Sequence, residues 1–371
     1  MRVLSVIGSL SLGGAETYLS RIVRDISAYG VYMEVCALER AGPRLAELEA
    51  AGVRVHGTPY LERTQRSNSL TLLRTIRRIR EIVRAGRFDI VHTYLFWSDV
   101  LGALGAKLAG CPRIIVSRRA MHRWAHSPRA FYHGLEQMAN LQATDLIANS
   151  RAVLLDAEAS EQCLPAARTV IYNGVDVDTY TPTRRRLDRP LRLVTIGALA
   201  PRKGQQFAIE AMRLLRTSGV EASLTLVGSG PDEKALREQV AAAGLDDIVK
   251  FEGEQLDPRP YLACADVFLL PSRQEGFSNA VLEAMASGLP VVATDVGGNA
   301  EAIVDGEGGR IVPPENSEAL AAAIAETSRS RTRLGEMGDY NRRRAIEHFS
   351  LKASMRRLAD WYLSRRMGRT L

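Results

Sequence analysis

The sequence is poor in cysteine and has no long apolar run. Its 371 residues include only four cysteines, which stand singly, so neither a CxxC metal site nor a dense disulfide framework is expected. No stretch reaches the roughly 18 to 20 uninterrupted apolar residues that a membrane-spanning helix needs. The apolar run at residues 3–7 is too short for a signal peptide. We therefore expect a protein of the reducing cytoplasm whose membrane contacts, if any, are peripheral.

The composition indicates a globular chain with more than one core. Hydrophobic residues make up 46% of the sequence and charged residues 25%, which excludes a disordered or fibrous protein. A chain of 371 residues is too long for a single compact core and is typical of two domains of ordinary size.

Positive charge is concentrated in two regions. The formal net charge is +7, and residues 70–135 hold 12 Lys and Arg against 3 Asp and Glu, while residues 329–371 hold 12 against 4. Such an excess predicts an anionic partner, for which a nucleotide, a phospholipid surface and nucleic acid all qualify. No recognised nucleic-acid motif accompanies the basic residues, so a nucleic-acid partner is not expected.

Residues 70–84 are predicted to form an amphipathic helix whose apolar face consists of Leu72, Leu73, Ile76, Ile79 and Val83. Its arginines form either a solvated face of a helix packed on a sheet or a contact with an anionic membrane. Residues 117–126 mix cations with Trp124 directly after a predicted strand. Cations at such a position commonly face the cleft of an open α/β sheet.

Short apolar runs alternate with helix-period segments, which predicts parallel sheets covered by helices. Strands are expected at residues 3–7, 32–37, 90–92, 114–117, 146–149, 191–196, 223–227, 248–251, 267–270 and 291–294. The polar, proline-flanked residues 180–190 suit a linker. The fold class is therefore α/β, with two doubly wound, Rossmann-like domains at residues 1–183 and 184–350 that face each other across a cleft. A helical tail at residues 351–371 follows.

The stretch at residues 269–294 is predicted to be a strand, a loop, a helix and a second strand. Ser278 is a plausible N-cap, so Glu275 lies in the loop and Glu283 in the second turn of the helix. The backbone amides of residues 277–279 stand at the positive end of this helix, where a phosphate is favoured. A phosphate flanked by a sugar and a ribose would use both carboxylates. The alternative is that Glu275 is a loop charge and Glu283 a helix-surface acid.

These residues resemble the retaining, nucleotide-sugar-dependent glycosyltransferases of family 4, which have the two-domain GT-B fold. The resemblance starts from EGFSNAVLE at residues 275–283, which is followed by AMASGLPVVAT and a Gly297-Gly298 pair. It extends along the chain through GGAE at 13–16, NS at 149–150, YNGVD at 172–176, KG at 203–204, GSGP at 228–231 and FLLPS at 268–272.

The resemblance implies a donor site in the second domain and an acceptor side in the first. Glu275 would hold the hydroxyls of the donor sugar, and Glu283 those of the ribose. Lys203 would neutralise the departing diphosphate, which is a charge that the site must stabilise. The amides of Gly276, Phe277, Ser278 and Asn279 would meet the sugar and the diphosphate.

The resemblance also suggests roles for three glycines and one arginine, and each glycine has an alternative interpretation as a turn residue. Gly13 and Gly14 would let the backbone approach the acceptor or the donor phosphate, unless they only form a tight turn. Gly228 would border the nucleotide, or it is a turn residue. Arg202 could add a cation for the diphosphate. Lys203 itself has the alternative of a solvent-exposed loop lysine.

Two positions depart from the family pattern. Ala198 stands where the family usually has an arginine, so one diphosphate cation is missing. Arg119 stands where many members have a histidine near the reacting sugar. An arginine cannot act as a base at neutral pH, although it binds phosphate. Arg118, Arg119 and Arg123 could therefore clamp a phosphate on the acceptor side.

Three other signals are discounted. Asp176 and Asp178 match the DxD pattern of a different glycosyltransferase fold, but they follow an Asn-Gly pair at the domain junction, so no metal is expected. His92 is more plausible as a hydrogen-bonded strand-end residue than as a catalyst. The loop at residues 8–14 is not GxGxxG, and no acidic partner for a nicotinamide ribose follows it, which disfavours a dehydrogenase.

The resulting expectation is a retaining hexosyl- or N-acetylhexosaminyltransferase that moves a sugar from a UDP- or GDP-sugar to a hydroxyl acceptor, without a metal or other cofactor. The acceptor is expected to be a lipid-linked or cell-envelope glycan at the inner membrane face. The alternatives are a synthase of a soluble disaccharide or sugar phosphate and a nucleotide-sugar-binding protein without turnover. The tail around Trp361 is expected to cross back to the first domain.

Overall fold

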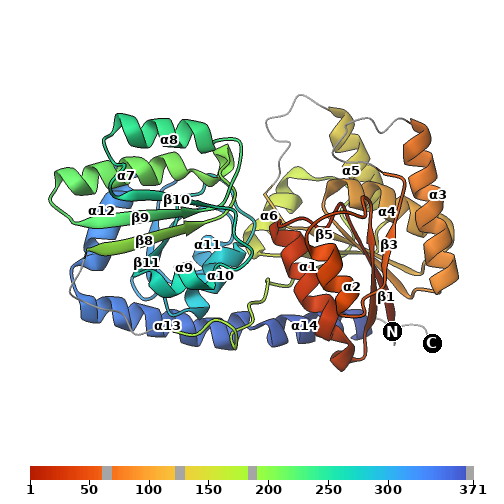
Figure 1. Cartoon of the computed structure of the whole chain (residues 1–371). Helices are drawn as coiled ribbons and strands as arrows, with labels where there is room; N and C mark the ends of the chain where they lie inside the picture. The colour runs from red at the N-terminus through yellow and green to blue at the C-terminus, as the bar shows by residue number, and fades with distance from the viewer. Residues whose placement is uncertain (61–68, 122–129, 183–189, 365–371) are drawn as a thin grey trace. The chain divides into compact units, whose positions relative to one another are not determined.

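The computed structural model describes residues 1–60, 69–121, 130–182 and 190–364 (Figure 1). Its contacts divide the chain into two compact units, one of Met1–Asn173 with Leu351–Leu371 and one of Gly174–Ser350. The boundary expected at residues 183 and 184 lies at a segment outside the described residues and stays a prediction. Each unit is built around one parallel sheet, as the alternating pattern predicts.

The first unit has a seven-stranded sheet in the order β3-β2-β1-β4-β5-β6-β7. Every neighbouring pair in it is parallel. The strands are β1 (Arg2–Ile7), β2 (Tyr32–Ala37), β3 (Val55–Gly57), β4 (Ile90–Tyr94), β5 (Arg113–Arg118), β6 (Asp145–Ala148) and β7 (Ala167–Val170). The helices are α1 (Gly14–Asp25), α2 (Arg44–Ala50), α3 (Ser69–Gly86), α4 (Phe96–Ala109), α5 (Ala130–Gln142), α6 (Arg151–Ser160) and α14 (Leu351–Ser364), with a 3₁₀ turn η1 (Ile26–Tyr29).

The second unit has a six-stranded parallel sheet in the order β10-β9-β8-β11-β12-β13. Its strands are β8 (Leu191–Ile196), β9 (Ala222–Val227), β10 (Val249–Gly253), β11 (Val267–Leu270), β12 (Val291–Thr294) and β13 (Gly309–Val312). Its helices are α7 (Gln205–Thr217), α8 (Glu233–Ala242), α9 (Arg259–Cys264), α10 (Asn279–Ala286), α11 (Asn299–Ala302), α12 (Ser317–Ser328) and α13 (Arg331–Phe349), with a 3₁₀ turn η2 (Pro201–Lys203).

All ten predicted strands are present, and three further strands, β3, β7 and β13, were not predicted from the sequence. Each of the three stands at the edge of its sheet. An edge strand is covered on fewer sides, and most residues of these three are only half-buried or exposed. They therefore lack the continuous apolar run by which central parallel strands, such as β11 with all four residues buried, are recognised.

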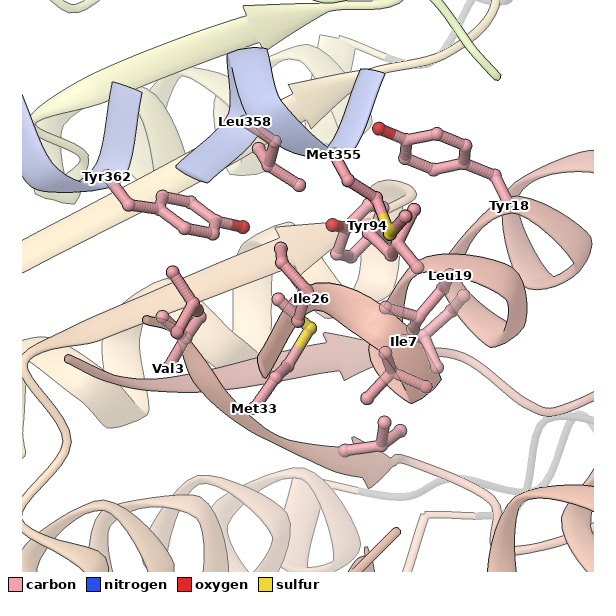
Figure 2. Close-up of a cluster of buried hydrophobic side chains, with 14 of the residues drawn as sticks. Val3, Ile7, Tyr18, Leu19, Ile26, Met33, Tyr94, Met355, Leu358 and Tyr362 are labelled. Carbon is pink, nitrogen blue, oxygen red and sulfur yellow. The ribbon is translucent and has the colours of Figure 1, made fainter. Parts of the chain in front are cut away.

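The C-terminal helix α14 packs into the core of the first unit, which confirms the expected return of the chain. Figure 2 shows Met355, Leu358 and Tyr362 of this helix among buried side chains of the unit, including Tyr18 and Tyr94. The Tyr18 hydroxyl lies 3.0 Å from the Ser354 hydroxyl. The Arg113 guanidinium donates to the last carbonyls of the helix, those of Trp361 at 3.0 Å and Tyr362 at 2.8 Å.

His92 lies inside β4 and has a structural role, as the more plausible of its two interpretations predicted. Its Nδ1 is 2.6 Å from the Tyr362 hydroxyl and its Nε2 is 2.7 Å from the Ser117 hydroxyl. Burial, reinforced by the positive charges of Arg119 and Arg113, holds the pKa of His92 well below its usual value. The imidazole is therefore neutral and links β4 to β5 and α14.

The helix predicted at residues 70–84 exists as α3, but its predicted apolar face is only partly correct. Ile79 and Val83 are buried, whereas Leu73 is 63% exposed. Leu70, at the start of the helix, is 60% exposed. None of the described helices is both long enough and apolar enough to cross a bilayer.

Leu358→Ala should lower the free energy of unfolding of the first unit by about 2–5 kcal/mol, because it removes a fully buried side chain from a packed core. Urea unfolding of the full chain, followed with probes in each unit, measures the change. Leu108→Ala is the control, since Leu108 is 52% exposed in the same unit, and it should change stability by less than about 0.5 kcal/mol. Equal losses in the two variants would contradict the packing of α14 described above.

Candidate functional site

The strand order of the second unit brings two loops together. The chain places β9 and β10 on one side of β8 and then returns to place β11, β12 and β13 on the other. The loops after β8 and β11 therefore start side by side at the carboxyl edge of the sheet and then diverge. Ligands bind at this point in open α/β sheets. Lys203 lies in the first of these loops and Glu275 in the second.

Lys203 and Glu275 form an ion pair at this edge. The Nζ atom of Lys203 is 2.5 Å from Oε1 of Glu275, and the two side chains are 14% and 7% exposed. The hydroxyl of Ser272, which is completely buried, donates to the same carboxylate oxygen at 2.7 Å. Lys203 is therefore not the solvent-exposed loop lysine of the alternative interpretation. Ser272 belongs to a motif quoted for the family resemblance, but nothing in its sequence context assigned it to Glu275.

Backbone contacts hold the two loops against each other. The carbonyl oxygen of Arg202 accepts hydrogen bonds from the amides of Arg273, at 2.8 Å, and Gln274, at 3.2 Å. Gly204 has a φ of +65°, and a Cβ atom there would lie 2.1 Å from the carbonyl oxygen of Pro271. Only glycine fits this close approach, which keeps Lys203 within reach of Glu275.

The loop after β12 supports the Glu275 loop from a third direction. Gly297 has a φ of +55°, and a Cβ atom there would lie 2.3 Å from the carbonyl oxygen of Glu275. The amide of Gly298 donates to the carbonyl oxygen of Gly276 at 2.8 Å. The Gly297-Gly298 pair of the motif thus fixes the backbone beside the carboxylate.

Helix α10 begins where the sequence predicts. The Ser278 hydroxyl caps it by accepting from the amide of Val281, and Gly288 follows its end with a φ of +67°. Gly276, Phe277 and Asn279 surround this positive helix end, beside Glu275. Glu283 is only 6% exposed, so it is not the helix-surface acid of the alternative interpretation.

Arg202 and Gly228, both expected at the donor site, lie after β8 and β9 respectively. Gly228 has a φ of +145°, and a Cβ atom there would lie 2.0 Å from the carbonyl oxygen of Gly197. It is therefore a point of close backbone contact, next to Ala198, whose side chain is exposed. Arg202 is exposed on η2, one residue before Lys203.

The glycine pair of the first unit stands at the N-terminus of α1. Gly13 is the N-cap residue and Gly14 the first residue of the helix. The φ of Gly13 is −67°, so its backbone does not require glycine. A Cβ atom there would instead lie 2.2 Å from a carboxylate oxygen of Glu16. The Glu16 side chain also accepts from the Ser11 hydroxyl at 3.3 Å.

The guanidinium of Arg118 is hydrogen-bonded to side chains of the protein itself. Its guanidinium donates to Asp99 at 2.8 Å, to Asn140 at 2.8 Å and twice to Glu161 at 2.7 Å. The side chain is 8% exposed. Four of its donor bonds are thus directed at protein acceptors, which argues against the expected role of Arg118 in clamping an acceptor phosphate. Arg123 lies outside the described residues.

Arg119 is held between aromatic rings and motif residues. Its guanidinium lies over the ring of Tyr18, with its central carbon 4.3 Å from the ring centroid, and donates to the side-chain oxygen of Asn173. Asn149 donates to its backbone carbonyl at 3.2 Å. Burial lowers its pKa, with the opposite contribution of Tyr18 next in size. Two asparagines of the family motifs thus fix the residue that replaces the histidine.

The strand order of the first unit also changes direction, between β1 and β4. A cavity of about 310 Å³ opens at the carboxyl ends of these strands, and Gly8, Leu95, Arg118 and Arg119 contribute to its lining. Leu95, which precedes α4, has a φ of +73° and a ψ of 160°, a conformation that side-chain-bearing residues rarely adopt. No sequence signal identified Leu95 or the cavity.

The DxD pattern forms a local turn. The Asp176 carboxylate accepts from the amide of Asp178 at 3.1 Å, and the Asp176 carbonyl accepts from the Thr179 hydroxyl at 2.9 Å. Within the described residues, no group of three or more His, Cys, Asp or Glu side chains has the arrangement of a metal site.

Two family models match most of the chain. The model described as Glycosyltransferase Family 4 matches residues 12–179, and the one described as Glycosyl transferases group 1 matches residues 190–330. Together they cover every strand of the first unit except β1, and most of the second unit.

Curated relatives match about three quarters or more of the chain. The D-inositol 3-phosphate glycosyltransferase of Pseudarthrobacter chlorophenolicus is 30% identical, over 85% of this chain and 82% of the relative. A GDP-mannose-dependent alpha-(1-6)-phosphatidylinositol monomannoside mannosyltransferase of Mycolicibacterium smegmatis is also 30% identical, over 76% of this chain and 79% of the relative.

The fold has solved counterparts. The crystal structure of HepE from Anabaena in complex with UDP superposes with a TM-score of 0.82, at 22% identity, over 98% of this chain and all of that one. At this identity the match concerns the fold, which is GT-B, as predicted.

Gly297→Ala should destabilise the protein by about 2 kcal/mol more than Gly306→Ala. Both glycines have a positive φ, which costs an alanine about 1–2 kcal/mol. Only at Gly297 does the new Cβ meet a backbone atom, whereas nothing lies within 4 Å of the position at Gly306. Urea denaturation of the two variants measures the difference, and equal stabilities would contradict the packing of Gly297 on Glu275.

Proposed function

The chain belongs to the family 4, group 1 glycosyltransferases, and from this we propose that it transfers a sugar from a UDP- or GDP-sugar to a hydroxyl acceptor with retention of configuration. The observation that carries the proposal is the ion pair of Lys203 and Glu275 at the switch point of the second sheet. A cation and a carboxylate in contact there supply one group for a diphosphate and one for sugar hydroxyls.

Donor binding would exchange the partners of this pair. The diphosphate competes for the Lys203 ammonium, and the carboxylate of Glu275 then accepts from hydroxyls of the donor sugar. Ser272 keeps its hydrogen bond to Glu275 and holds the carboxylate in place.

Glu283 would bind the ribose, while the amides of Gly276, Phe277, Ser278 and Asn279 favour the diphosphate through the helix dipole. Arg202 and Gly228 would border the nucleotide.

In the proposed transfer step, the leaving phosphate takes the role of the base in place of a protein side chain. The acceptor hydroxyl attacks the anomeric carbon from the side of the leaving group, its proton goes to the departing phosphate oxygen, and the nucleoside diphosphate leaves. Lys203 and the helix amides stabilise the charge that develops on that phosphate. Catalysis is then mainly positioning and charge stabilisation, without a metal. A nucleotide-sugar-binding protein without turnover is the alternative, because Ala198 leaves one family cation absent.

A lipid-linked or cell-envelope glycan is the proposed acceptor, glycosylated at the cytoplasmic face of the membrane. Two observations support it: the phosphatidylinositol mannoside in the name of one relative, and the surface of α3. Leu70 and Leu73 are exposed on the helix face that also carries Arg74 and Arg77. Apolar side chains flanked by cations are typical of a helix that lies on an anionic bilayer. A soluble disaccharide or sugar phosphate synthase is the enzymatic alternative.

Lys203→Ala and Glu275→Ala should each lower kcat by at least about 10²-fold, since each removes a group proposed to act on the donor. Release of UDP or GDP from a panel of nucleotide-sugars measures turnover, and thermal unfolding verifies that the variants fold. Lys234→Ala, at a 90% exposed lysine side chain on α8, is the control and should keep full activity. Full turnover by either site variant would refute the assignment.

The double variant Leu70→Ser with Leu73→Ser should bind anionic vesicles at least about tenfold more weakly than the parent protein, because each exposed leucine contributes about 1.5–3 kcal/mol on burial. Flotation with phosphatidylglycerol-containing vesicles at low salt measures binding. Leu256→Ser, at a leucine 77% exposed in the second unit, is the control. If the parent protein does not bind such vesicles, the membrane contact is refuted, but the proposed glycosyl transfer is not.

A further inference from the structure

The cavity of the first unit has a wall of aromatic side chains. Phe96 and Trp97 begin α4, and Tyr132 comes from α5; all three line the cavity. Their rings meet edge to face, with centroids 5.3 Å apart for Phe96 and Trp97 and 5.6 Å apart for Phe96 and Tyr132. The electron-rich faces of such rings attract the weakly positive C–H groups of a sugar ring.

Ser98, one of the residues around this cavity, has a buried hydroxyl without a partner among the described residues. Its side chain is completely buried, it lines the cavity, and its Oγ has no hydrogen-bond partner among the residues that the structure describes. A buried hydroxyl is usually hydrogen-bonded, and an exception calls for an explanation such as a ligand. Ser20 of α1 is also completely buried with an unpartnered Oγ, but it does not line the cavity.

Carboxylates outnumber cations around the cavity. Among the described lining residues, the cations are Arg118 and Arg119, and the acids are Glu16, Asp99, Glu136, Asp156 and Glu161. Arg118 is already bonded to two of these acids. Burial raises the pKa of Glu136 to about 7; Arg118 opposes the rise, and the neighbouring acids Glu161, Asp99 and Asp156 add to it. The carboxyl groups of Asp99 and Glu136 already resist ionisation beside their neighbours, and a further anion in the cavity would be repelled by those acids that are ionised.

We propose that the cavity binds an uncharged hexopyranose ring of the acceptor, stacked on the aromatic wall and hydrogen-bonded to Ser98 and to the carboxylates. This inference rests on the proposed function and specifies its acceptor. It replaces the expectation that Arg118, Arg119 and Arg123 clamp a phosphate, because Arg118 is committed to acids of the protein. Neutral hydroxyls, by contrast, donate readily to carboxylates.

A ligand panel tests the charge requirement without any turnover. Methyl hexopyranosides of glucose, galactose and mannose are titrated by ligand-observed NMR beside the corresponding hexose 6-phosphates and methyl hexuronosides. At least one neutral hexoside should bind, and its charged counterparts should bind at least about tenfold more weakly. Binding of a phosphorylated or uronic ligand as tightly as the neutral one, or the absence of binding by every hexoside, overturns the proposal.

Ser98→Ala and Ser20→Ala form a matched pair of variants. Each removes an unpartnered buried hydroxyl, so neither should lower the melting temperature. Ser98→Ala should weaken hexoside binding about fivefold, whereas Ser20→Ala should leave it unchanged. A purely structural hydroxyl would not separate the two, so equal hexoside affinities in both variants count against the proposal.

Trp97→Phe and Trp97→Ala examine the aromatic wall. The phenylalanine keeps a ring face and should retain most of the hexoside affinity, while the alanine should lose at least about fivefold. Release of UDP or GDP from the donor panel, measured in parallel, reports on the proposed function. A protein that binds hexosides but turns over no donor disproves the transferase activity alone, and one that turns over donor without this selectivity disproves the cavity assignment alone.

Discussion

The contact between Lys203 and Glu275 depends on one topological constraint, the reversal of strand order in a parallel sheet. Parallel strands need crossover helices, and when the chain returns to the middle of the sheet, the loops on either side of that point diverge. In the second unit the reversal lies between β8 and β11, and it brings together two side chains 72 residues apart in the sequence. The first unit repeats the arrangement between β1 and β4, where its cavity opens.

Close backbone packing turns this position into a defined geometry. Gly204, Gly228 and Gly297 each stand where a Cβ atom would lie 2.0–2.3 Å from a carbonyl oxygen of a neighbouring loop. With the two amides that donate to the Arg202 carbonyl, these contacts leave the loops little freedom. A site that stabilises charge needs such rigidity, since donors that are already oriented spend no free energy on reorganisation.

The two units handle charge differently. The second unit places one ammonium against one carboxylate. The first unit surrounds Arg118 with acids and holds Arg119 over Tyr18. The positive excess at residues 70–135 therefore does not give a positive cavity: Arg113 and Arg118 are paired with buried acids, and others, such as Arg74, are exposed on α3. A count of charges along the chain predicts a partner's sign only where those charges remain available.

The sequence by itself determined the fold class, ten of the thirteen strands in the described residues, the capped start of α10 at Ser278 and, through resemblance, the family. These features are written in local patterns: apolar runs, capping residues and ordered motifs. Tertiary structure decided what local pattern cannot encode. Edge strands such as β7 lack a buried run, the partners of Arg118 come from α4, α5 and the residue after α6, and Ser272 and Ser98 have roles set by what faces them. The reason is physical: a pattern fixes which side chains are buried, whereas only the arrangement of the strands fixes which of them meet.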